Sequence, residues 1–331
     1  MASSVPPVYV APGRKSGFGI WPWLALLAIL VVGILGFRIW ALLTPDVVKP
    51  SVGLIEVSGA ISDSGASTLL GGTSGGARQF IRQTEAARKD PQIKAVVIRI
   101  NSPGGAASAS QEMYEAVMRL RKEKPVIGSM GDVAASGGYY TAAACDKIYA
   151  NRATTTGSIG VITSLLNYQE LFAKIGLDQA TIKSGKFKDA GNPARPLTPE
   201  ERQLFQQLIN NLYNQFVNDV VDGRKEATKG TLTREKLLKL ADGRVYTGEQ
   251  AVKNGLIDEN GDLYTAVSFA KQKGGLPEDA PVTPLAGGSG GLLSLFGASA
   301  QSGAEGFGAA FARGAMGEFK SEAKDLPTAR Y

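Results

Sequence analysis

The chain has 331 residues, a net charge of +6 and no histidine, which excludes a Ser-His-Asp triad, a Cys-His pair and any histidine-ligated zinc site. Lys and Arg are interleaved with Asp and Glu, and no DNA- or RNA-binding motif is present, so we expect a solvated basic surface and no nucleic-acid partner. The single cysteine, Cys145, excludes an intrachain disulfide, and its alanine-rich surroundings predict a buried structural thiol.

The first element in chain order is a candidate membrane anchor. Residues 20–37 are uncharged and mostly Leu, Ile, Val and Ala, a length at the lower limit for crossing a bilayer. We expect an anchor over residues 19–43 and a cytoplasmic tail over 1–18, because Arg14 and Lys15 precede the apolar run. The remainder of the chain is then expected outside the cytoplasm. A cleaved signal peptide is the alternative, but no small-residue cleavage site follows the run.

Short β-branched runs alternate with helical patterns over residues 51–275. The predicted strands are 52–57, 95–100, 126–130 and 179–183. The predicted helices are 77–89, 108–122, 198–222, 234–240 and 248–254. This alternation predicts an α/β domain in which a parallel sheet is flanked by helices. Beyond this domain the composition shifts to Gly and Ala, so residues 276–331 are expected to form a flexible tail.

Two motifs follow predicted strands and precede predicted helices. Asn101–Gly105 contains a Ser-Pro-Gly-Gly turn, which can leave backbone N–H groups facing a ligand. Gly131–Tyr140 places Ser136 among small residues at the start of a helix, where developing negative charge is favoured. Taken singly, a tight turn and a helix N-cap are the better explanations of these two motifs.

A third motif, Lys183–Asp189, contains three lysines after the predicted strand 179–183. A lysine that acts as a general base must be neutral near pH 7, so its pKa has to fall from about 10.4, at a cost of about 4 kcal/mol. Burial in an apolar site can supply this shift. A solvated loop is the usual interpretation of such a cluster, and the residues alone do not choose between Lys183, Lys186 and Lys188.

Together the three motifs resemble the signal peptide peptidase A family. The resemblance covers residues 52–270 and continues, in the family's order, through Thr156–Val161, Gly243–Gly248 and Asn254–Asp258. It implies the fold of the Clp proteases and crotonases, carried by a membrane-anchored serine endopeptidase with a Ser–Lys pair. It also implies remnant signal peptides as substrates, with no metal or organic cofactor.

The family's functional residues can be assigned to the matching positions of each motif in this sequence. The resemblance implies that Ser136 is the nucleophile, that Lys188 is the general base and that Ser158 supports the lysine. It implies an oxyanion hole made by the backbone N–H groups of Gly105 and Gly137. The single copy of the domain resembles the family's short form, so we expect a ring-shaped homo-oligomer at the bacterial inner membrane, with neighbouring subunits completing each active site.

Three alternatives stay open at this point. The nearest is a membrane Ser–Lys protease of the same fold that cuts a stomatin-like partner. A crotonase-like acyl-CoA enzyme is a second alternative, although such enzymes usually rely on Glu or Asp bases and are rarely anchored in membranes. The third is a non-catalytic membrane scaffold, for which replacing Ser136 with alanine changes nothing.

Overall fold

The computed structural model describes residues 21–43, 49–64, 66–67, 73–74 and 76–285. It divides into two compact units, Met1–Lys49 and Pro50–Tyr331. The first contains one helix, α1 (Trp21–Leu43). Among the described residues, no helix has both the length and the apolar character that a membrane crossing requires. The predicted tail 1–18, the first residues of the predicted anchor and most of the predicted tail 276–331 lie outside the described residues.

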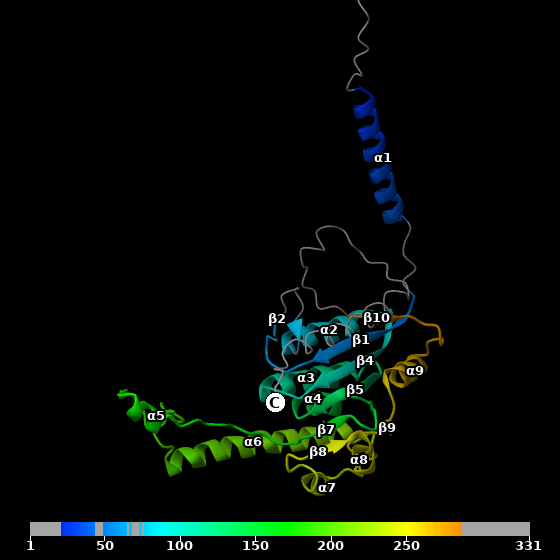
Figure 1. The fold of residues 1–331 in the computed structure, drawn as a ribbon. Helices are drawn as coiled ribbons and strands as arrows, with labels where there is room; N and C mark the ends of the chain where they lie inside the picture. Colours follow the sequence, from blue (N-terminus) through cyan, green and yellow to red (C-terminus); the bar gives the residue numbers. More distant parts are fainter. Residues whose placement is uncertain (1–20, 44–48, 65, 68–72, 75, 286–331) are drawn as a thin grey trace, which may run out of the picture. The chain divides into compact units, whose positions relative to one another are not determined.

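A mostly parallel sheet forms the centre of the second unit (Figure 1). Its path runs β10-β1-β4-β5-β6-β9, and β7 joins β5 to β8; only the β7–β8 pair is antiparallel. The strands are β1 (Ser51–Ser58), β4 (Ile93–Ser102), β5 (Val126–Ala135), β6 (Lys147–Ala150), β7 (Thr155–Gly157), β8 (Val245–Thr247), β9 (Glu259–Asn260) and β10 (Val282–Pro284). A separate hairpin pairs β2 (Ala66–Ser67) with β3 (Thr73–Ser74).

Helices cover both faces of this sheet, which confirms the predicted α/β layering. The second unit contains the helices α2 (Ala77–Lys89), α3 (Ala107–Leu120), α4 (Gly137–Ala143), α5 (Gln169–Lys174), α6 (Pro199–Arg224), α7 (Arg234–Leu238), α8 (Gly248–Lys253) and α9 (Leu263–Lys273). Alternate residues of β4 belong to different cores: Ile98 packs with the α2–α3–α4 side, whereas Val97 packs with α9. Burial on both faces explains why the strands read as nearly continuous apolar runs.

The predicted strand over 179–183 is wrong. Residues 177–183 form neither strand nor helix, and the Ile182 side chain is fully exposed. A β-branched run becomes a strand only where a neighbouring strand can satisfy its backbone hydrogen bonds, and no described strand pairs with this segment. The other three predicted strands are confirmed: 52–57 and 95–100 lie within β1 and β4, and 126–130 forms the first half of β5.

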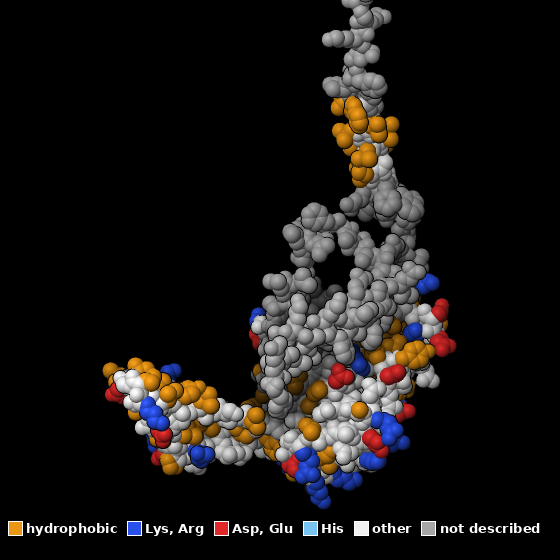
Figure 2. Space-filling model, viewed as in Figure 1, with side chains coloured by type: hydrophobic (Ala, Val, Ile, Leu, Met, Phe, Trp, Pro, Cys, Tyr) orange, Lys and Arg blue, Asp and Glu red, His pale blue; other side chains and the backbone are white. Residues whose placement is uncertain are grey.

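Residues 161–211 extend beyond the sheet, and we call this segment the arm. It comprises an irregular stretch, α5 and the N-terminal half of α6, and Figure 1 shows α5 at the end of α6 that is remote from the sheet. Large apolar side chains are exposed along it, and Figure 2 shows them as orange patches. They include Ile162, Leu165, Leu166, Leu171, Ile175, Leu177, Ile182, Phe187, Leu204 and Leu208. A contiguous apolar surface of this kind is typical of an interface.

Candidate active site

Ser136 lies on a strained turn between β5 and α4. Its backbone has φ 51° and ψ −120°, a conformation that non-glycine residues rarely adopt and that costs about 1–3 kcal/mol. The Ser136 N–H donates to the Gly157 carbonyl oxygen at 2.8 Å, which holds the turn. The sequence lacks the Gly-x-Ser-x-Gly of hydrolase elbows, yet the chain forms the same sharp strand-to-helix turn that presents a serine hydroxyl.

The Ser-Pro-Gly-Gly turn at the end of β4 packs directly against this serine turn. Gly104 has φ +97°, and a Cβ placed on it would lie 2.6 Å from the Gly137 nitrogen. The Gly104 carbonyl accepts from the Ile61 N–H at 2.8 Å, and the Ala106 N–H donates to the Ile61 carbonyl at 2.9 Å. Within the described ranges, neither the Gly105 N–H nor the Gly137 N–H donates a hydrogen bond. Two backbone donors are thus available beside Ser136.

Ser158 lies next to Ser136 at the same edge of the sheet. Strands β5 and β7 are parallel, with Ala135 opposite Gly157, so each serine is the first residue after a paired position. Ser158 also has a positive φ, of 50°, and its N–H donates to the Arg244 carbonyl at 2.8 Å. The structure therefore brings together four of the five predicted site residues.

A largely apolar pocket of about 350 Å³ opens beside Ser136. It is lined by Gly105, Ala106, Ala107, Ser110, Ser136, Gly137, Tyr140, Gly160, Val161, Ile162, Thr163, Leu208, Ile209, Leu212 and Phe216. The Tyr140 and Phe216 rings stack with centroids 4.3 Å apart, and Tyr140 also donates to the Asp219 carboxylate. Such a pocket suits a small or medium apolar side chain.

The α6 wall of the pocket is missing from the sequence-based prediction. Leu208, Leu212 and Phe216 are four residues apart, which places them on one face of the helix. That spacing is visible in the sequence, but only the fold shows that this face lines the serine pocket, with Phe216 also part of the core.

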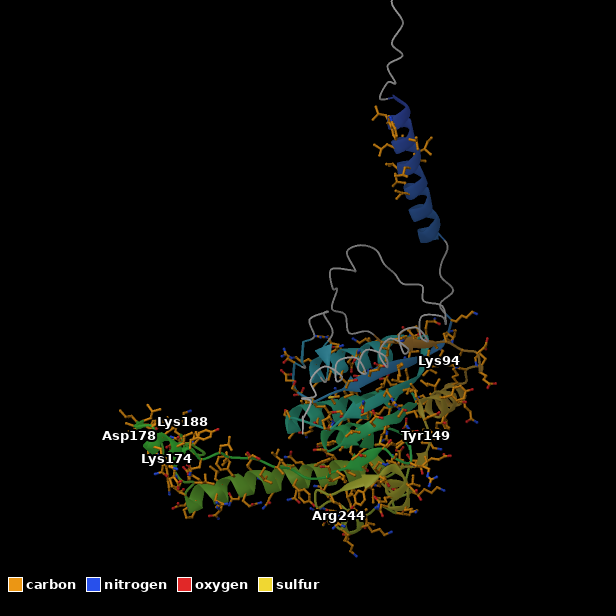
Figure 3. The ribbon with its side chains drawn as sticks, in the orientation of Figure 1. Lys94, Tyr149, Lys174, Asp178, Lys188 and Arg244 are labelled. Atoms are coloured by element: carbon orange, nitrogen blue, oxygen red, sulfur yellow. The ribbon has the colours of Figure 1, made fainter. Side chains whose placement is uncertain are left out.

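Lys188 does not lie at this pocket. It is exposed on the arm, and Figure 3 labels it at the end of the arm that carries α5, away from the sheet. The other two candidate lysines are occupied: Lys183 Nζ lies 2.5 Å from Asp189, and Lys186 Nζ lies 3.5 Å from a carboxylate oxygen of α6. Among the described residues, Lys188 forms no ion pair, so it is the lysine of the three whose amine is available.

Two further observations concern the cysteine and possible metal ligands. Cys145 is fully buried, and desolvation raises the pKa of its thiol to about 12, which confirms a structural role. Within the described ranges, no group of three or more His, Cys, Asp or Glu side chains is arranged to hold a metal ion.

Comparison with known proteins identifies the family. Residues 118–276 match peptidase family S49. The chain is 37% identical over 231 residues to a putative protease of Synechocystis, an alignment that covers 70% of this chain and 77% of that protein. It is 39% identical over 220 residues to the putative signal peptide peptidase SppA of Enterococcus faecium, covering 66% of this chain and 62% of that protein. The chain belongs to peptidase family S49.

Other relatives are longer than this chain. The chloroplastic serine protease SPPA of Arabidopsis thaliana is 39% identical over 236 residues, covering 71% of this chain but only 34% of that protein. This chain thus spans between about a third and three-fifths of the length of these two SppA relatives.

A solved structure of a membrane-bound stomatin-specific protease, determined as a point mutant, is 18% identical to this chain, and the match covers 72% of this chain and 98% of that one. Its TM-score of 0.43 is too low to establish a common fold.

Proposed function

We propose that this chain is a serine endopeptidase that uses Ser136 as its nucleophile. The observation that supports this most strongly is the junction of the two turns, where a strained serine meets two available N–H groups and an apolar pocket. The hydroxyl oxygen attacks the scissile carbonyl as its proton passes to a lysine amine. The carbon–nitrogen bond then breaks, the amine leaves with that proton, and water hydrolyses the acyl-enzyme.

The two turns supply the electrostatic part of the reaction. In this proposal, the N–H groups of Gly105 and Gly137 bind the oxyanion of the tetrahedral intermediate. A donor of this kind accelerates acyl transfer by about 10²–10³-fold, because it is already oriented where the negative charge develops. Ser158, next to the nucleophile, hydrogen-bonds the incoming lysine amine.

The general base is Lys188 of a neighbouring copy of the chain. Lys188 lies on the arm, outside its own chain's pocket, and the arm carries the exposed apolar side chains that an interface between copies would bury. Repeating the same contact between successive copies closes a ring in which each chain gives its serine to one site and its lysine to the next. Burial of a lysine between subunits favours the neutral amine that a base requires.

The proposed substrates are apolar peptides, in particular remnants of signal peptides after their release from preproteins. The apolar lining of the Ser136 pocket supports this class, as does the similarity to a putative signal peptide peptidase of Enterococcus faecium. The uncharged run over residues 20–37 supports an anchor in the inner membrane, with the catalytic unit outside the cytoplasm.

Subunit mixing tests the proposal directly. Full-length Ser136→Ala and Lys188→Ala chains, each inactive alone against a fluorogenic apolar peptide, are co-expressed with different affinity tags and purified in tandem in detergent. If each site takes its serine and lysine from adjacent chains, random rings recover about one quarter of the wild-type sites. No recovery in intact mixed rings excludes a lysine supplied by the neighbour, and activity of Ser136→Ala alone excludes the nucleophile.

A further inference from the structure

Four charged side chains form a network around the loop that carries Lys188. Arg195 donates from Nε to a carboxylate oxygen of Asp189 at 3.0 Å and from Nη2 to the Asp189 carbonyl oxygen at 3.1 Å. Lys183 Nζ donates to the other carboxylate oxygen of Asp189 at 2.5 Å. Arg195 also binds both carboxylate oxygens of Glu201, at 2.9 Å and 2.5 Å. We call Lys183, Asp189, Arg195 and Glu201 the Arg195 network.

The network differs from the surface ion pairs of the same segment. The Glu201 and Asp189 side chains are only 3% and 11% exposed. Hydrogen bonds from Arg195 are the main reason that the pKa values of both carboxyls are lowered to about 2. By contrast, Lys186 and Glu200 pair at 3.5 Å with side chains 68% and 56% exposed, a geometry that contributes little to stability. A planar guanidinium that binds one carboxylate with two nitrogens fixes orientation, which an exposed pair does not.

The network fastens the lysine loop to the first turn of α6. Glu201 is also the N3 partner of the N-cap Thr198 in a capping box, because its carboxylate accepts from the Thr198 N–H at 3.0 Å and its own N–H donates to Thr198 Oγ1 at 3.2 Å. The helix spans 26 residues, and Phe216, Val217 and Val220 bury its other half in the core. Arg195 therefore connects the loop to a continuous rod that is anchored in the body of the protein.

Outside the network, the ion pair described between this loop and α6 is the exposed Lys186–Glu200 pair. Residues 177–183 have no regular secondary structure, and residues 184–191 form bends and turns with mostly exposed side chains. The Lys188 N–H donates to the Gly185 carbonyl at 3.1 Å, which shapes the turn but does not attach it to α6. Asp189 follows Lys188 directly, so the Arg195 contacts fix the backbone position from which the lysine side chain projects.

We propose that Arg195 is a positioning residue that holds Lys188 at the location from which it reaches Ser136 of the neighbouring copy. This inference rests on the proposed function, because it assigns Arg195 a role through the lysine donated by one chain to the next. Arg195 touches neither the substrate nor the reacting atoms. Its loss allows the loop to shift, and a misplacement of about 1 Å in a reacting group can cost about 10²-fold in rate.

Mixed rings separate this role from a general role in folding or assembly. The parent mixture contains full-length Ser136→Ala chains, which donate Lys188, and Lys188→Ala chains, which donate Ser136. Arg195→Met is placed on the lysine donor in a first mixture and on the serine donor in a second. Both mixtures contain the same number of altered arms, so any effect on ring formation is matched. Lys186→Met on the lysine donor is the control for loss of an arm ion pair outside the network.

The expected result is asymmetric. The first mixture loses about 10–10²-fold in kcat with KM little changed, whereas the second keeps the parent activity because every lysine donor retains its network. Equal losses in both mixtures overturn the proposal in favour of an assembly role, and equal retention overturns it outright. If Arg195→Met chains fail to fold, Asp189→Asn, which keeps the shape of the side chain, must show the same asymmetry. An inactive parent mixture in intact rings overturns the proposed function and this inference together.

Discussion

Replacement of Gly137 with alanine tests whether the close contact behind the serine turn controls the position of Ser136, the proposed nucleophile. An added Cβ would lie 2.2 Å from Ser110 Oγ, well inside van der Waals contact. Ser110 cannot easily move away, because it is 1% exposed and its hydroxyl donates to the Ala106 carbonyl at 2.9 Å. Gly137 is not among the residues with positive φ, so alanine fits the backbone and the steric contact is the main penalty.

The size of the effect follows from that contact. Overpacking of a close-packed site costs about 1–3 kcal/mol. Because Gly137 is adjacent to Ser136, a displacement of about 1 Å at the turn lowers kcat by about 10²-fold. Ser110→Ala removes the nearest atom and leaves the Ser110 Cβ, which lies 3.1 Å from the added methyl position. Alone, Ser110→Ala costs only its hydrogen bond, about 1 kcal/mol.

The double variant gives the decisive comparison. Urea unfolding and peptide hydrolysis are measured for the wild type, both single variants and the Gly137→Ala, Ser110→Ala combination. The double variant should be more stable and more active than Gly137→Ala alone, with a favourable coupling of about 1–2 kcal/mol, since the two changes share one contact. A double variant no better than Gly137→Ala would refute the steric argument.

Three further predictions address the pocket, the interior and the arm. Phe216→Ala removes the stacked ring beside Tyr140, so the free energy of unfolding should fall by about 3–5 kcal/mol. Because the pocket becomes larger, the peptide preference should shift toward larger side chains; an unchanged preference would mean that the substrate side chain binds elsewhere. Asp258→Ala should destabilise the protein by about 3–5 kcal/mol in urea, because Arg224 is completely buried and pairs with Asp258 at 2.6 Å. Glu249→Ala, which removes an exposed pair with Arg152, is the control and should have little effect. The carboxyl pKa values of the Arg195 network are lowered, so its stabilisation is present above about pH 4 and is lost as the pH falls toward about 2. The Tm difference between wild type and Arg195→Met should therefore shrink over that range, and a constant difference would contradict the linkage.

Much of the site can be predicted because its residues follow buried strands. The runs that end at Ile100 and Met130 are apolar enough to identify β4 and β5 from the sequence, and the motifs after them lie at the same edge of the sheet. Ser158 can be predicted only through family resemblance. Its strand, β7, has three residues, and it exists because Thr155–Gly157 pairs with β5 and with the distant β8. Pairing over such sequence distances leaves little local pattern to detect.

The arm marks the limit of sequence-based prediction. Residues 179–183 have the composition of a strand, but the nearest sheet lies beyond their reach and the segment remains irregular and exposed. Sequence patterns assume that apolar residues are buried within one chain. The arm departs from that assumption, and Ile162 and Ile182 are 89% and 102% exposed. The same departure explains why the residues alone leave three lysines as candidates, since the environment of a lysine on an exposed arm is not encoded locally.

The buried thiol has a practical consequence for observing the arm. Cys145 is the only cysteine of the chain, and a thiol with a pKa raised to about 12 and no solvent contact is inert toward maleimides at neutral pH. The natural sequence is therefore already a background without reactive cysteines. A single Ile182→Cys substitution, at a fully exposed position, gives one attachment point for a fluorophore or a cross-linker. In the proposed ring, distances between labels on adjacent chains can then be followed during turnover without altering any other residue.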